Sequence, residues 1–516
     1  MKRNARVAIF LALIFTTLTA SAQKYSFENI TRKTLRNSGT IKDNNVIKGY
    51  YYFYYLEKVS RQNTAYEVVI LNENLEEKGS ERIIEPKTTV LLEASYNGNS
   101  ILFKFFDRKS KTVSYRTMNN AGEMSSKETR SCNKYEAQIY GTSTIENINI
   151  QPVSSELFVD IHNIKDKEYK YSVEGIGNDG EVLWTYTPTN QMKIEMGNYL
   201  GSSENQVWIQ VSKSKGIMSR DYTFDLAGIS HDGEEDFRVP LQTKRYNLLA
   251  HSATYKKDKD EIVVVGEYYD ISDKSLKSDS KGLFVKVISP EGDEISEDFI
   301  SWTRDIGAMV SAEKKRELSK YYVYFHDILQ TADGRILAVG EQYRKQVSAT
   351  GMAFKTLAAA SGGSTNASAA EIKIADVIVI ELSTNYELTS VDIHEKKPRK
   401  VLLEAGYGTV SQHLLAKYLK ASGWFDYQFT QTNKDNSTIS FAYVDIEKVD
   451  GKMRRQAVLK FISYVSGEDD YTSDKLELTS EASDIWLMPA KPGYVLIAEY
   501  FKKEKAVDFR LEPINY

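Results

Sequence analysis

The sequence predicts an all-β protein, a single β-propeller of about eight four-stranded blades, with seven blades as the alternative. Two kinds of β-hairpin alternate along the chain, and together they form a four-strand unit that recurs about every 50 to 60 residues. One strand of each unit is continuously apolar. With 516 residues, 41% hydrophobic residues and only 9 prolines, the chain can build a large core and is neither disordered nor collagen-like.

The first 22 residues have the pattern of an export signal. Three basic side chains lie within residues 2–6, residues 7–18 are apolar, and residues 20–22 (Ala-Ser-Ala) form a small-residue cleavage site. We expect a signal peptide over 1–22, a propeller domain over 23–516, and export to the periplasm or the cell exterior. The apolar run is too short to span a bilayer, so no transmembrane segment is predicted.

The first hairpin type joins a moderately apolar strand to a strongly apolar one through a polar turn. Its cleanest copy spans 327–343, and related copies lie at 91–106, 251–268, 427–443 and 486–501. The second strands, such as 262–265 (Ile-Val-Val-Val) and 336–339 (Ile-Leu-Ala-Val), are apolar without interruption. This pattern predicts strands that are buried on both faces.

The second hairpin type follows the first and alternates apolar with polar residues. Copies lie at 114–128, 171–186, 222–239 and 283–299. Their turns contain Gly, Asn and Asp, as in 178–180 (Asn-Asp-Gly), because these residues adopt the positive φ of tight hairpin turns easily.

The last unit of the repeat contains only three strands, at 484–488, 493–501 and 505–514. We expect residues 24–30 to supply its fourth strand. Such a closure would remove the unpaired sheet edges that invite aggregation.

This repeat of four-strand meanders resembles the secreted kelch-like and related repeat propellers over most of the mature chain. Neither a kelch double glycine nor a Trp-Asp signature recurs. Among such proteins, the chain is most similar to uncharacterised exported propellers of Gram-negative bacteria. The resemblance implies a fold and carries no activity or site residues with it.

Three insertions interrupt the repeat, at 303–324, 346–375 and 396–423. We expect helices at 306–322 and 410–419, and an Ala/Ser/Gly-rich mobile loop in the second insertion. All three join strands at the end opposite the tight turns, so they should form one decorated face. Long insertions of this kind are often functional, although decoration that only covers surface is the alternative.

The candidate site residues are Asp327, Asp426, His326, Trp302 and Trp424. The two Asp residues begin inner strands of neighbouring units, where carboxylates near the ring axis could act as an acid/base pair on a glycan. His326 could serve as a base or ligand, and either Trp as a sugar platform. Because Asp recurs at this repeat position, a structural role is the alternative.

Several function classes are excluded or disfavoured. The formal net charge is −4 and the sequence has no basic block, so it lacks the positive charge that a nucleic-acid-binding surface needs. The 6 histidines and the single Cys132 form no metal-ligand motif, and no P-loop, dinucleotide fingerprint or nucleophile elbow occurs. We therefore expect no metal, no cofactor and, as the leading function, a non-catalytic binding or scaffolding protein with an unknown protein or glycan partner. The alternative is a carbohydrate-active propeller hydrolase.

Overall fold

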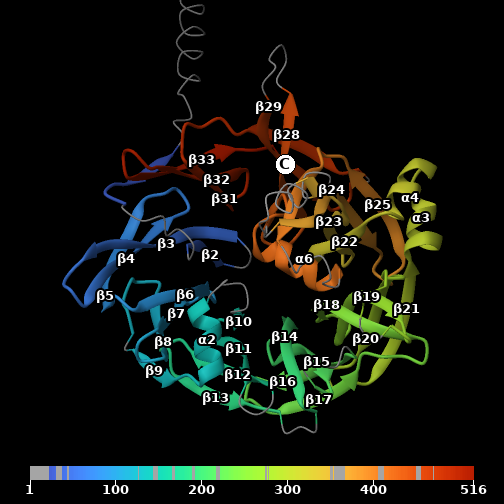
Figure 1. Ribbon diagram of the computed structural model, residues 1–516, viewed down its shortest axis with the longest axis horizontal. Coiled ribbons are helices and arrows are strands. Elements are labelled where there is room, and N and C mark those ends of the chain that lie inside the picture. The colour runs from blue at the N-terminus through green and yellow to red at the C-terminus, as the bar shows by residue number, and fades with distance from the viewer. Residues whose placement is uncertain are drawn as a thin grey trace, which may run out of the picture.

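Eight four-stranded antiparallel sheets form a ring, arranged as the blades of a β-propeller (Figure 1). This confirms the predicted fold with eight blades rather than seven. The computed structural model describes residues 23–30, 38–43, 46–125, 127–142, 149–165, 169–188, 192–216, 221–273, 276, 278–348, 352–353, 367–404, 412–448, 455–468 and 470–515. The predicted signal peptide over 1–22 therefore lies outside the described residues.

In the first four blades the strands follow one another outward from the ring axis (Figure 1). Blade 1 contains β2 (Gly39–Asp43), β3 (Val46–Lys58), β4 (Asn63–Asn72) and β5 (Glu77–Pro86). Blade 2 contains β6 (Thr89–Tyr96), β7 (Ser100–Asp107), β8 (Thr112–Asn119) and β9 (Glu128–Ser131). Blade 3 contains β10 (Asn149–Ser154), β11 (Leu157–Lys165), β12 (Tyr169–Gly177) and β13 (Val182–Tyr186). Blade 4 contains β14 (Ile194–Ser202), β15 (Gln206–Ser214), β16 (Thr223–Ser230) and β17 (Glu235–Pro240).

The remaining blades follow the same order until the last one. Blade 5 contains β18 (Tyr246–Lys256), β19 (Glu261–Asp270), β20 (Gly282–Ile288) and β21 (Glu294–Ser301). Blade 6 contains β22 (Tyr322–Gln330), β23 (Ile336–Val347), β24 (Ala367–Leu382) and β25 (Leu388–His394). Blade 7 contains β27 (Tyr427–Thr432), β28 (Thr438–Lys448), β29 (Arg455–Val465) and β30 (Thr472–Glu477). Blade 8 contains β31 (Asp484–Pro489), β32 (Tyr494–Phe501), β33 (Ala506–Pro513) and the N-terminal β1 (Lys24–Phe27).

The N-terminal strand closes the ring as predicted. β1 pairs antiparallel with β33, with Lys24 opposite Arg510 and Phe27 opposite Val507. Phe27 is buried and its ring lies 5.8 Å from Tyr52 of blade 1 and 5.3 Å from Phe509 of blade 8, centroid to centroid. One short strand therefore completes a sheet and also packs at the interface between the first and last blades.

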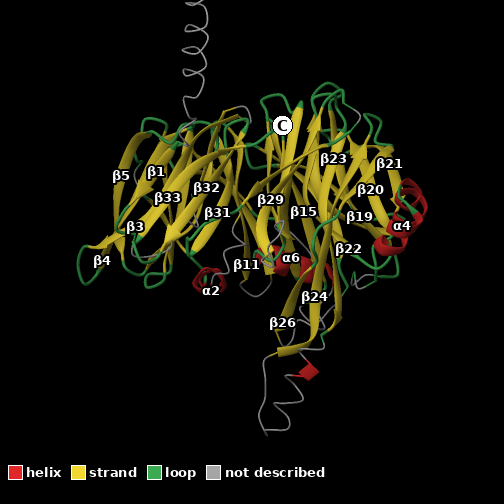
Figure 2. Cartoon of the chain, turned by 90° about the horizontal axis from the view of Figure 1, so that it is seen from above, coloured by secondary structure: helices red, strands yellow, loops and turns green. Residues whose placement is uncertain are grey.

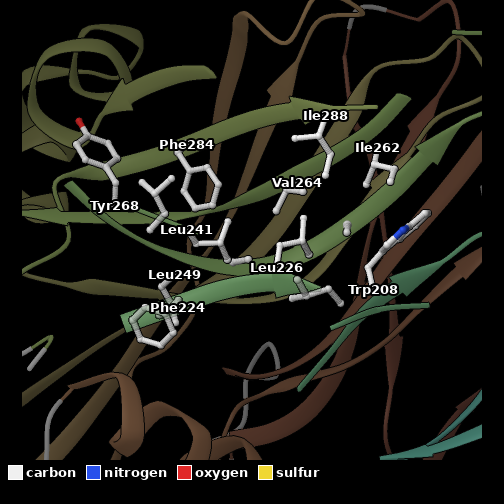
Figure 3. Packing of buried hydrophobic residues seen from close by; sticks show 14 of the residues in the cluster. Trp208, Phe224, Leu226, Leu241, Leu249, Ile262, Val264, Tyr268, Phe284 and Ile288 are labelled. Atoms are coloured by element: carbon white, nitrogen blue, oxygen red, sulfur yellow. The ribbon is translucent and has the colours of Figure 1, made fainter. Parts of the chain in front are cut away.

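The core consists of apolar side chains between adjacent blades. Figure 3 shows the contact between blades 4 and 5, where Trp208 and Phe284 have no exposed surface. Strand β19, predicted to be buried on both faces, is buried at every position from Ile262 to Tyr269. Burying apolar area contributes about 25 cal/mol per Å², so these interfaces provide the main driving force for folding.

The tight turns lie at one end of the blades and the second and third insertions at the other, whereas the helices of the first insertion lie at the outer edge of the ring (Figures 1 and 2). Turn glycines such as Gly180 and Gly233 have the positive φ expected of them, at 87° and 85°. Figure 2 shows α2 (Lys134–Thr142), α6 (Gln412–Ala421) and the extension of β24 with β26 (Arg399–Glu404) on one side of the ring. The first predicted insertion forms η3 (Trp302–Ile306), α3 (Gly307–Met309) and α4 (Ala312–Leu318), which confirms its helical character.

The second insertion differs in part from the prediction of a loop over 346–375. Strand β23 continues to Val347 and β24 begins at Ala367, so both ends of this segment are strand. Ile372 and Ile374 are fully buried against β26 and α6, because they alternate with polar residues and face that packing layer. The Ala/Ser/Gly-rich centre at 358–364 lies outside the described residues. The predicted helix at 410–419 corresponds to α6, whereas α2 and β26 were not predicted.

No helix among the described residues is both long and apolar enough to cross a bilayer.

The closure of the ring leads to a first prediction. Phe27→Ala should lower the free energy of unfolding by about 3 kcal/mol, because it leaves a cavity between blades 8 and 1. Ser26→Ala is the matched control, since Ser26 is exposed and its hydroxyl donates a hydrogen bond to Asp508; it should change stability by less than about 1 kcal/mol. Urea denaturation measures both, and equal effects would contradict the closing role of β1.

Candidate functional site

Four of the five candidate residues lie at the interface of blades 6 and 7. His326 and Asp327 belong to β22, whereas Trp424 and Asp426 immediately precede β27. The fifth, Trp302, lies at the start of η3 beside blade 5. We call the group formed by His326, Asp327, Glu341, Lys396, Asp426 and Tyr427 the inter-blade cluster.

A β-bulge at His326 determines how this side chain points. The register of β22 against β23 shifts between Phe325 and Asp327, and a bulge re-aims the side chains of the bulged strand. The imidazole lies 4.3 Å from the Tyr427 ring in a stacked arrangement, with Nε2 3.2 Å from a carboxylate oxygen of Glu341. Burial lowers the pKa of His326, although Glu341 acts in the opposite direction.

The same arrangement, a histidine at a register shift beside a glutamate, occurs one blade earlier. The register of β18 shifts at His251, and His251 Nε2 lies 3.0 Å from Glu267 Oε2 on β19. The recurring Gly-Glu sequence at the end of the apolar strand therefore pairs with a histidine inside its own blade.

Glu341 is the centre of the inter-blade cluster. It has no exposed side-chain surface and accepts a 2.8 Å hydrogen bond from the Tyr427 backbone N–H. Lys396 Nζ lies 3.1 Å from Glu341 Oε1 and 2.5 Å from Asp426 Oδ2, and Arg399 contacts the other oxygen of Asp426 at 3.1 Å. Burial raises the pKa of Asp426, and the charge of Lys396 opposes this shift.

Asp327 accepts a hydrogen bond from the Tyr427 hydroxyl. Lys420 of α6 approaches from the insertion side, with Nζ 3.4 Å from His326 Nδ1. Burial lowers the pKa of Lys420, against the charges of Asp327 and Glu341. Neither Lys396 nor Lys420 was a candidate from sequence, because both belong to the third insertion, far from β22 in the chain.

The charged side chains of the inter-blade cluster are paired with one another. The side chain of Asp426 is only 11% exposed, and both its oxygens are in ion pairs. Trp424 lies against Arg399, whose guanidinium is 5.1 Å from the Trp424 ring centroid. An acid/base role for Asp327 and Asp426 stays a prediction, and the geometry described here is that of a buried network whose charges are paired with one another.

Trp302 occupies a different setting, in a cleft of about 970 Å³ at the insertion-bearing end of blade 5. We call this the blade-5 cleft. Its walls come from three connections, at 243–246, 279–281 and 301–304. The Trp302 indole stacks on Phe325 at 6.3 Å with an interplanar angle of 11°, and its N–H donates to Ser280 Oγ at 3.1 Å. Two contacts thus fix the orientation of the ring.

The floor of the blade-5 cleft is aromatic. Tyr246, Tyr268 and Phe299 pack with ring centroids 4.8 to 5.0 Å apart. Figure 3 shows the Tyr268 hydroxyl directed away from the core between blades 4 and 5. The floor of the cleft is therefore part of the packed interior of the ring and is rigid. Its rim, in contrast, consists of loops.

A second buried polar group lies between blades 2 and 3. Asp160, His162 and Glu174 share one face of blade 3, with potential ligand atoms within 4.8 Å of one another. Lys104 forms an ion pair with Asp160, and Arg130 lies 3.0 Å from Glu174 Oε1. Two side-chain cations therefore already neutralise the carboxylates that a metal ion would need, so the geometry fits a structural network better than a metal centre.

Lys396→Met should destabilise the protein strongly. It leaves Glu341 and Asp426 buried without their shared cation, and breaking a buried pair in this way costs about 3 to 5 kcal/mol. Lys502→Met, at an exposed position, is the control and should change stability by less than about 0.5 kcal/mol. Urea midpoints give the comparison, and equal midpoints for the two variants would show that the cluster is not held by Lys396.

Glu93 provides a pH-dependent prediction. Burial raises its pKa to about 8, against a hydrogen bond from the Ile150 N–H. The folded chain thus keeps a proton that the unfolded chain loses near the usual value of 4.5. From about pH 5 to pH 8 the wild type should lose stability relative to Glu93→Gln, by at most about 1.4 kcal/mol per pH unit.

Denaturation at several pH values measures this difference. The exposed Glu504→Gln is the control and should follow the wild type. Parallel curves for wild type and Glu93→Gln would show that this carboxyl is ionised in the folded chain.

The comparisons with solved structures return distant propellers. A polysaccharide lyase of a new family, an ulvan lyase, shares 11% identity over 82% of this chain and 91% of its own, with a TM-score of 0.39. The β-propeller domain of the trilobed protease from Pyrococcus furiosus shares 10% identity over 85% and 96%, with a TM-score of 0.35. An α-L-arabinofuranosidase from Fusarium graminearum shares 8% over 71% and 93%, with a TM-score of 0.33.

These likenesses are too weak to carry an activity to this chain. No curated protein matches it. A family model, in contrast, matches residues 1–515, nearly the whole sequence. The chain therefore belongs to DUF6770, a family of unknown function.

Proposed function

We propose that this protein is an exported, non-catalytic binding protein of the cell envelope, and that its ligand occupies the blade-5 cleft. Export rests on the signal-like pattern of residues 1–22. The binding role rests on the cleft, which lies on the face that carries the insertions.

The single observation that carries the proposal is the composition of the blade-5 cleft. A volume of about 970 Å³ is at the upper end of ordinary ligand pockets. Its floor is aromatic and fixed by core packing, and its rim carries exposed polar and charged side chains from three connections. A few oriented polar groups around an apolar surface are typical of a binding site.

A hydrolase that uses Asp327 and Asp426 remains the competing function. Glycoside hydrolysis needs two carboxyl groups that face the substrate and exchange protons with it. Asp426 is instead engaged by Lys396 and Arg399, and Asp327 by the Tyr427 hydroxyl. This arrangement favours a structural role for the two Asp residues, so the binding function is better supported than the hydrolase function.

Trp302→Ala tests the proposed site. It removes the ring that forms one wall of the blade-5 cleft, so binding should fall at least about tenfold, as for the loss of a central aromatic contact. Trp302→Phe keeps an aromatic face and should retain most of the binding. The labelled wild type and both variants are compared on an array of glycans, with circular dichroism as a check of folding.

Unchanged binding by a folded Trp302→Ala variant would place the ligand elsewhere. Hydrolysis products that disappear in Asp327→Asn or Asp426→Asn would instead support the hydrolase.

A further inference from the structure

We propose that the blade-5 cleft binds an acidic glycan, a sugar chain bearing carboxylate groups; this inference rests on the proposed function and names its ligand class. The inference combines three observations: the aromatic floor, three cations (Lys244, Arg245 and Lys281) without an ion-paired carboxylate among the described residues, and carboxylates that are already oriented.

The aromatic side chains of the cleft suit the apolar faces of sugar rings. Tyr246, Phe299 and Trp302 are each half-buried and line the cleft, so part of each ring remains open to a ligand. The Trp302 ring is held from behind by Phe325 and at its N–H by Ser280. A platform that is already fixed loses little conformational entropy on binding.

Two adjacent cations at the rim supply the charge preference. Lys244 and Arg245 are exposed and line the cleft, and neither forms an ion pair with a carboxylate in the described part of the chain. An Arg guanidinium can bind a carboxylate through two parallel hydrogen bonds. Arg304, by contrast, is paired with Asp305 at 2.9 Å.

The carboxylates of the cleft distinguish an acidic sugar from a compact anion such as phosphate. Asp270 accepts bonds from Ser272, and Asp279 accepts one from the Tyr322 hydroxyl at 2.6 Å. These bonds orient the carboxylates and leave further lone pairs that can accept hydrogen bonds from sugar hydroxyls. A compact anion would experience their repulsion without this gain, whereas an acidic sugar offers both a carboxylate and hydroxyl groups.

Calorimetric titration with two sugar chains of equal length, one charged and one uncharged, tests the inference. The probes are tetragalacturonic acid and maltotetraose, each titrated into the full chain. The acidic tetramer should bind at least about tenfold more tightly, and its affinity should fall with added salt. Lys244→Ala/Arg245→Ala should weaken the acidic tetramer about tenfold or more and leave the neutral one unchanged.

Lys257→Ala is the matched control, because Lys257 is a 78% exposed lysine on the tight-turn end of the same blade. It should bind both tetramers as the wild type does. Trp302→Ala should weaken any sugar that enters the cleft, charged or not.

Each remaining outcome overturns at least one of the two proposals. Equal binding of both tetramers that Trp302→Ala abolishes would refute the acidic-glycan inference and leave the binding function intact. Binding that survives both the double variant and Trp302→Ala would refute the cleft as the site and with it both proposals. If neither tetramer binds, the acidic-glycan inference is refuted. The binding function is tested separately by the glycan array.

Discussion

Each blade of this ring depends on its two neighbours, because both faces of its sheet are apolar and must be covered. Strand β19 is buried from Ile262 to Tyr269, and its residues divide between two cores. Ile262 and Val264 pack toward blade 4, whereas Val263 and Val265 pack toward blade 6. A sheet of this kind cannot be stable alone, so the blades stabilise one another around the ring. The same constraint explains why the chain returns to its beginning: without β1, the last sheet would end at an open edge.

Polar groups between the blades follow from the same geometry. A charged side chain on a blade face has no access to bulk water and must find its partner in the interface. Glu341 bonds His326, Lys396 and a backbone N–H, and Asp160 bonds Lys104 and Tyr115. The charges of these networks are paired within the fold, although Asp160 Oδ1 and Glu341 Oε1 accept no hydrogen bond from the described residues. The pKa shifts of these groups therefore follow from burial and pairing and do not by themselves mark a catalytic centre.

The blade-5 cleft differs from these networks in where it lies. Its walls come from connections between strands rather than from the blade faces, so its charged side chains reach solvent. Its floor belongs to the packed core through Tyr268, which lies in the cluster shared by blades 4 and 5. Rigid strands thus hold loop residues in place, which is the usual way in which a repeat fold presents a binding surface.

The sequence by itself determined the fold and much of its order. Hydrophobic runs such as 336–339, turn glycines and the missing fourth strand of the last unit were enough to predict eight blades closed by the N-terminus, because these signals are local and repeated. The sequence also singled out His326, Asp327, Asp426 and Trp302. Only the tertiary structure decided which side chains surround them. Lys396 and Lys420 reach the cluster from an irregular insertion, and the walls of the blade-5 cleft come from three connections separated along the chain. Long-range pairings of this kind leave no periodic signal, since charge partners and cleft walls are set by how the blades meet rather than by the spacing within one strand.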